Sequence, residues 1–181
     1  MAQRSEDVAN ALLHLATTGE TAVVASFISS DANRFNALAN KGHLGILMET
    51  LARLDNAQQT TVLAASESIS YGAPNATVLQ TIVASRDPVI VDRLQDVLNG
   101  LNTSQHVNIL SAPNAVWWLG AYDQDKLVCD LSRNLSANER QTIADRADNL
   151  RYAIDEICSS ELTGLFKDCT FKTKPAPAPG A

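Results

Sequence analysis

The segment LDNAQQTTVL, residues 54–63, is echoed by LNTSQHVNIL, residues 101–110, which lies 47 positions further along the chain. Aligned without gaps, both begin with Leu, continue with Asp or Asn, carry Gln at the fifth position and end in Val-Leu or Ile-Leu. An Asp or Asn followed three residues later by Gln is a capping box, in which two side chains satisfy free amides at the start of a helix. Each copy therefore predicts a helix that begins just after a leucine ending the previous helix.

The same box recurs at two other places in the chain. Ser136 and Glu139 form its commonest version, and Thr17 with Glu20 forms a fainter one. The leucines at these turns lie 39, 47 and 34 residues apart: Leu15, Leu54, Leu101 and Leu135. This spacing fits two-helix repeats in the size class of tetratricopeptide, HEAT and armadillo units, without the strict period of any of them. Convergence of ordinary helical hairpins on one turn chemistry is the alternative to duplication, and both predict stacked helix pairs.

Other helix starts are marked by proline or by a capping acid. Asp87-Pro88 offers a cap followed by proline at the first helical position, where no amide is needed, and Ala73-Pro74 and Ala112-Pro113 are similar. Four further helices are predicted, and the first residue named caps or begins each of them. They run from Asp31 to Leu38, from Gly42 to Leu54, from Asp123 to Leu135 and, as a long amphipathic helix, from Ser136 to Ile157.

No alternating pattern of a β-strand competes with these helices. We expect an all-α fold of irregular stacked helical hairpins, either solenoid-like or a multi-helix bundle, with no β-sheet. A chain of 181 residues is long enough to bury a core without disulfides or metals. We therefore predict a single helical domain over residues 1–171 and a disordered Pro/Ala tail over residues 172–181, where apolar residues are too few to pack.

Charge and hydropathy exclude several classes of partner. The net charge is -6, from 14 basic and 20 acidic side chains, and no stripe of Lys or Arg could follow a phosphate backbone, so nucleic acid is excluded as a partner. Charged residues interrupt every apolar run well before the roughly 20 residues that a membrane span needs. The start lacks the order of a secretory signal. We expect a soluble, acidic, cytoplasmic protein, with delivery outside the cell by a non-classical route as the alternative.

Residues that carry catalysis or hold metals are sparse. The three histidines and three cysteines show no metal-ligand spacing: His14, His43, His106, Cys129, Cys158 and Cys169. Asp123-x-Asp125 lacks the Gly and distal Glu of a calcium loop. We predict no catalytic residues, no metal and no cofactor. The thiols are interpreted as free, with a disulfide between Cys158 and Cys169 as the alternative.

The charge distribution has one anomaly, over residues 97–122. These 26 consecutive residues contain no Asp, Glu, Lys or Arg, and they hold both tryptophans. Trp117 and Trp118 are adjacent on a predicted helix, so their side chains diverge by roughly 100° and cannot share one core-facing stripe. At least one indole is expected at the edge of the core, although burial of both between hairpins is the alternative. Depletion of charge and enrichment in Trp and Tyr are typical of interface centres.

These observations favour a protein-protein interaction module, an adaptor or a protein like a bacterial effector, over an enzyme. The expected partner is another protein or a second copy of the chain. The predicted partner-binding residues are Trp117, Trp118, Tyr122, Tyr71, His106 and Asn108. A small enzyme or ligand carrier with a pocket between helical hairpins is the alternative, with His106 and Asp123 as its polar groups.

Overall fold

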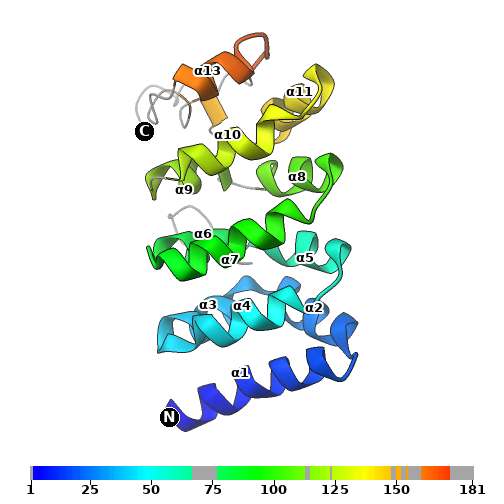
Figure 1. The fold of residues 1–181 in the computed structure, drawn as a ribbon, viewed down its shortest axis with the longest axis vertical. Coiled ribbons are helices and arrows are strands. Elements are labelled where there is room, and N and C mark those ends of the chain that lie inside the picture. Colours follow the sequence, from blue (N-terminus) through cyan, green and yellow to red (C-terminus); the bar gives the residue numbers. More distant parts are fainter. Residues whose placement is uncertain are drawn as a thin grey trace, which may run out of the picture.

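The computed structural model describes residues 2–66, 77–112, 115–122, 124–147, 150–151, 154 and 160–171. Within these ranges the regular elements are helices, and the one β-type pairing is an isolated bridge between Ser66 and Thr77. Figure 1 shows the helices stacked in layers from the N-terminal end of the molecule to the C-terminal end. The prediction of an all-α, stacked architecture is confirmed.

Each full layer contains three helices, where the sequence analysis predicted two. The first layer is α2 (Thr21–Ser29), α3 (Ala32–Leu38) and α4 (Leu44–Ala52). The second is α5 (Asn56–Leu63), α6 (Val78–Ala84) and α7 (Pro88–Asn99), and the third is α8 (Thr103–Leu110), α9 (Ala115–Ala121) and α10 (Asp125–Arg133). The middle helix of every layer has 7 residues, which is too short to show a helical period in the sequence.

Equivalent helices of successive layers pack on one another and form three rows (Figure 1). The first row runs α2, α5, α8 and then α11 (Ala137–Arg146). The middle row is α3, α6 and α9. In the third position α1 (Ala2–Thr17) packs on α4 and α4 on α7, while α10 contacts α13 (Ser160–Phe166). This is the arrangement of a solenoid, in which each layer buries its apolar faces against its neighbours.

The outer side of α1 closes the N-terminal end of the stack. Arg4, Glu6, Asp7 and Asn10 are exposed there, while Leu12 is buried toward the next layer. A polar outer face is what a terminal repeat requires, because no further layer covers it.

The three strong capping boxes are formed as predicted. Each first-row helix after α2 begins with one, with N-caps at Asp55, Asn102 and Ser136. The backbone amide of Gln58 donates to Asp55 Oδ1 at 2.8 Å, and that of Gln105 donates to Asn102 Oδ1 at 3.0 Å. The leucine that precedes each box is buried in the core; these are Leu54, Leu101 and Leu135.

A second device recurs at the same junctions, four residues after each cap. Gln59 Nε2 donates to the carbonyl of Leu51 at 3.2 Å, and a ring nitrogen of His106 lies 2.9 Å from the carbonyl of Leu98. At the third junction Arg140 donates to the carbonyl of Leu135. Leu51 and Leu98 lie in the last turns of α4 and α7, and their carbonyls also accept the backbone amides of Leu54 and Leu101. Leu135 follows the end of α10. At these three junctions the new helix thus bonds a carbonyl at or just after the end of the previous one.

Neighbouring junctions are also bonded to each other along this edge of the stack. Gln58 Nε2 donates to Thr21 Oγ1 of the layer below at 3.2 Å, and Thr103 lies close enough to Glu139 to help lower the pKa of its carboxylate. Asn56 Nδ2 donates at 2.8 Å to the carbonyl of Gly100, in the turn that leads from α7 to the layer above. These bonds fix the register of one layer on the next.

Three helix boundaries differ from the predicted ones. The box at Thr17 and Glu20 is wrong, because Thr17 ends α1 and Glu20 makes no side-chain cap bond at α2. The long helix from Ser136 ends at Arg146, since Ala147 has an extended backbone with ψ 118°. The helix predicted from Gly42 begins at Leu44, after a π-helical turn at residues 39–43.

Two predicted caps stand as expected, at Asp31 and at Asp87, each accepting a backbone amide two residues on. Other predictions lie outside the described residues: the starts at Ala73-Pro74, Pro113 and Asp123, and the tail at 172–181.

Replacement of Asn102 by Ala should lower the free energy of unfolding by about 1 kcal/mol, because the amides at the start of α8 lose their partner. Chemical denaturation with a circular dichroism readout measures this change. Asn108→Ala, at an exposed position inside the same helix, is the control and should change stability by less than about 0.5 kcal/mol. Equal effects of the two substitutions would contradict the capping role.

Acid should weaken the α11 junction more than the other two. The backbone amide and the hydroxyl of Ser136 bond to the carboxylate of Glu139 and lower its pKa. Because the folded-state pKa lies below the unfolded one, this stabilisation is complete above the ordinary pKa of a glutamate and is lost as pH falls through the lowered value.

The melting temperature of the parent protein should therefore fall between about pH 5 and pH 3, and this fall should be smaller in Glu139→Gln. Gln already fills this position at the other two boxes, so the junction itself should survive. The mirror variant, Gln105→Glu, should introduce a new pH dependence at the α8 junction. Parallel pH profiles for the parent and both variants would refute the assignment.

Candidate binding surface

An aromatic cluster occupies α9 and the residue after it. The rings of Trp117 and Trp118 meet edge to face, with centroids 4.3 Å apart and an interplanar angle of 77°. Trp118 stacks on Tyr122, with centroids 6.1 Å apart and an angle of 22°. Both geometries are favourable for aromatic pairs. Three large rings are thus gathered at one end of the middle row.

The cluster lies at the edge of the core. Trp117, Trp118 and Tyr122 are all partly exposed, so burial of both indoles is not what the fold adopts. Trp117 and Tyr122 pack against the buried core, whereas Trp118 contacts the other two rings. The indole N–H of Trp118 is buried and has no hydrogen-bond partner among the described residues. A buried donor of this kind usually finds an acceptor.

Arg86 connects this cluster to α6. Its guanidinium carbon lies 5.9 Å from the centroid of the Tyr122 ring, within the range of a cation–π contact. The backbone of Arg86 has φ 51°, and its amide donates to the carbonyl of Val83 at the end of α6. A left-handed residue in this position ends a helix, and glycine normally fills it because other residues are strained there. An exposed arginine is held here in its place.

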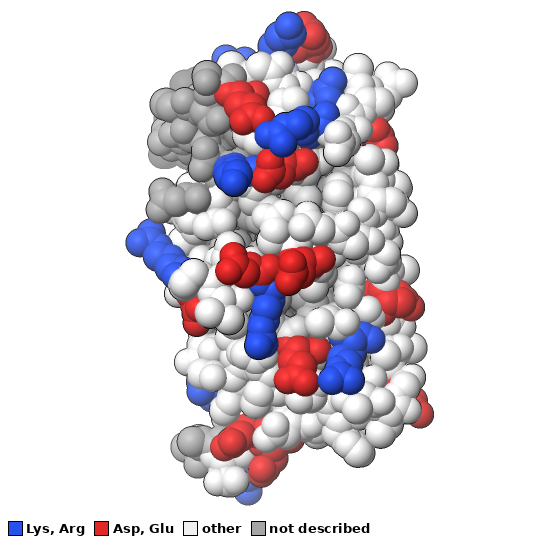
Figure 2. Space-filling view, viewed as in Figure 1, with Lys and Arg blue, Asp and Glu red and all other residues white. Residues whose placement is uncertain are grey.

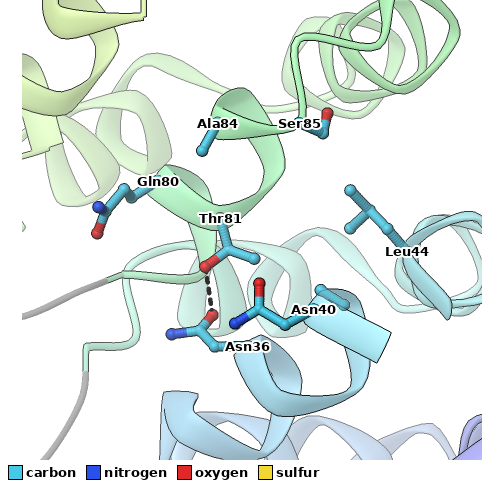
Figure 3. A pocket seen from close by; sticks show the side chains of 8 residues that line it. Asn36, Asn40, Leu44, Gln80, Thr81, Ala84 and Ser85 are labelled. Atoms are coloured by element: carbon cyan, nitrogen blue, oxygen red, sulfur yellow. Dashed lines mark hydrogen bonds between the residues drawn. The ribbon is translucent and has the colours of Figure 1, made fainter. Parts of the chain in front are cut away.

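A cavity of about 330 Å³ opens between the first and second layers, next to Arg86 in the chain. Its walls come from α3, the π-helical turn, the start of α4 and α6: Asn36, Ala39, Asn40, Leu44, Gln80, Thr81, Ala84 and Ser85. Figure 3 shows Asn36 and Asn40 on one wall, opposite the side chains of α6. None of the lining residues is charged.

Polar contacts set the shape of this cavity. Thr81 Oγ1 donates to Asn36 Oδ1 at 2.6 Å and joins the two walls (Figure 3). Gln80 Oε1 is buried and accepts no hydrogen bond within the described part of the chain. The π-helical turn holds Asn40, whose side chain is exposed, and Gly42, whose φ of 90° requires a residue without a Cβ.

Three of the six predicted partner-binding residues fall in the aromatic cluster: Trp117, Trp118 and Tyr122. His106 is bonded at the junction of α7 and α8, so its role in the fold is that of a cap. Asn108 is exposed on α8, with no ring contact or hydrogen bond to the cluster in the described structure. Tyr71 lies outside the described residues.

The sequence analysis missed Arg86 and the cavity residues. Arg86 stands directly before the Asp87-Pro88 helix start, where a tight turn could have been expected. The cavity gave no such signal, because Asn36 and Thr81 are 45 residues apart and meet only when the layers stack.

The described residues hold no group of His, Cys, Asp and Glu side chains that could bind a metal ion. A ring nitrogen of His43 lies 3.0 Å from Ser5 Oγ and links the π-helical turn to α1. Cys169 carries a free thiol, so the alternative of a disulfide between Cys158 and Cys169 is not adopted. Burial raises the pKa of the Cys169 thiol, which keeps it less reactive than an ordinary thiol. Cys129 is buried, and Cys158 lies outside the described residues.

Charges of both signs are interspersed over the face seen in Figure 2. Ion pairs join Glu49 to Arg53 on α4 at 3.4 Å, and Asp130 to Arg133 on α10 at 3.0 Å. This face offers no continuous basic stripe of the kind that binds nucleic acid. In the described part of the chain, every helix is too short or too polar to cross a membrane.

Comparison of the chain with models of known protein families, with curated proteins and with solved structures finds no match. The site must therefore be interpreted from its own residues.

The turn at Arg86 gives a matched pair of variants. Arg86→Gly and Arg86→Ala both remove the contact with Tyr122, but only glycine relieves the left-handed backbone. The glycine variant should be more stable than the alanine variant by about 0.5 to 1 kcal/mol in chemical denaturation, after allowing for the greater freedom of glycine in the unfolded chain. Equal or reversed stabilities would show that Arg86 is not strained.

Proposed function

We propose that this protein is a non-enzymatic protein-binding module whose contact surface centres on the aromatic cluster of Trp117, Trp118 and Tyr122, with Arg86 at its margin. The observation that carries the proposal is the setting of Trp118. Its ring is partly exposed and contacts two other rings, all three in a sequence segment, residues 97–122, without acidic or basic residues. Large aromatic side chains in a weakly charged patch are the usual centre of a protein interface.

The fold supports the same proposal. A stack of helical layers presents a continuous surface along each row of helices, and proteins of this architecture use such surfaces for binding. An adaptor role, with an effector role as a variant of it, fits a module of this kind.

A second candidate is a carrier of a small ligand, and the cavity between α3 and α6 favours it. Its volume of about 330 Å³ falls at the lower end of the range of small-molecule sites. The residues expected for that alternative, His106 and Asp123, do not line it.

The proposal is tested by selecting binders from a displayed library of random linear peptides on the folded protein. Trp118→Ala should weaken the selected peptides by more than fivefold, which is about 1 kcal/mol. Analytical ultracentrifugation of the parent and of Trp118→Ala tests self-association. If the parent forms dimers, the variant should dissociate into monomers at a higher protein concentration than the parent does.

Val23→Ala is the matched control, since it also truncates an exposed apolar side chain, at 54% exposure, but on α2. It should leave peptide affinity unchanged. Circular dichroism establishes that both variants are folded. Peptides that bind the Trp118→Ala protein as tightly as the parent would exclude the aromatic cluster as the binding surface.

A further inference from the structure

The cavity between α3 and α6 differs in its chemistry from the aromatic cluster. Five of its lining residues carry an amide or hydroxyl group, namely Asn36, Asn40, Gln80, Thr81 and Ser85, and the other three are aliphatic. With no charged group in the lining, an ionised occupant would lose hydration without gaining a counter-charge. The cavity therefore suits an uncharged group that both donates and accepts hydrogen bonds.

One position in the cavity specifies that group further. Asn40 is exposed on the π-helical turn, and Figure 3 shows its carboxamide directed toward Thr81 and Asn36. A carboxamide is the uncharged side-chain group that has two donor hydrogens and an acceptor oxygen in one plane. It can exchange paired hydrogen bonds with the carboxamide of Asn40.

A residue that lines the cavity is the chain neighbour of one that contacts the aromatic cluster. Ser85 lines the cavity, and the next residue, Arg86, lies over the ring of Tyr122. In the middle row α3 packs on α6 and α6 packs on α9, so the two features lie at successive layer boundaries. An extended segment advances about 3.3 Å per residue, so a short stretch of chain covers both features.

We propose that the cavity receives the side chain of an asparagine or glutamine from an extended peptide segment that also contacts Trp118. This inference rests on the proposed function and adds the identity of a second anchor residue. The aromatic cluster supplies apolar contact area, and the cavity selects one residue by its hydrogen bonds. Leaving a buried amide unpaired is costly, so the cavity discriminates against apolar residues at that position.

The test reverses the selectivity of the cavity. A peptide selected on the parent protein should carry Asn or Gln at one fixed distance from its aromatic residue. Asn40→Asp keeps the shape of the side chain but removes its donors and adds a negative charge. This variant should bind the parent peptide about tenfold more weakly, and it should prefer a version with Lys at the Asn or Gln position.

Asn33→Asp is the matched control, because it makes the same change at an exposed position of α3 outside the cavity lining. It should leave both affinities as they are in the parent. If Asn40→Asp also leaves both affinities unchanged while Trp118→Ala abolishes binding, the cavity proposal is overturned and the proposed function stands.

A second measurement does not depend on peptide binding. Titration with N-acetyl-glutamine methylamide, followed by amide NMR, should shift the resonances of α3, residues 39–43 and α6. N-acetyl-leucine methylamide should leave them in place. No shift with either compound overturns the cavity proposal, and shifts with the free compound in a protein that binds no peptide overturn the shared-segment proposal in favour of a small neutral ligand.

Discussion

The stack depends on how each helix end is satisfied by the start of the next helix. At the boundaries before α5, α8 and α11, a capping box bonds the free amides of the new helix. A side chain one turn into the new helix bonds a carbonyl in the last turn of α4 and of α7, and at the third boundary it bonds the carbonyl of Leu135, just after α10. Buried or half-buried backbone groups without partners cost about 1 to 3 kcal/mol each. Because both sets are paired within one tight turn, the two helices meet at a fixed angle, and repeated turns produce layers.

The middle row of helices is less regular than the first row. Its helices have 7 residues each and are not joined by the repeated boxes. It contains both unusual backbone conformations away from the α1–α2 turn, the π-helical turn with Gly42 and the left-handed Arg86. The cavity and the aromatic cluster adjoin these two places. Strain and irregular turns in otherwise regular folds often accompany binding sites. Two of the four buried side-chain atoms without a hydrogen-bond partner in the described structure, in Gln80 and Trp118, belong to these features.

The two halves of the candidate site followed from the sequence to different extents. The tryptophans were recognisable because adjacent indoles on one helix diverge and because their segment lacks charge. His106 was misleading for the same reason, since a neutral polar residue in that segment looked like part of a surface, although its ring bonds the carbonyl of Leu98. Asn36, Asn40 and Thr81 stood in no pattern, because the contact between them crosses two layers.

By itself the sequence determined where the layers begin, because capping is a local interaction among residues three or four positions apart. It also determined the helical class and the place of the aromatic residues. Tertiary structure decided that each layer has three helices, that α11 ends before Ala147, and that α3 and α6 flank an open cavity. The cavity depends on packing between residues 45 positions apart, where local propensity gives no signal and the fit of neighbouring layers prevails.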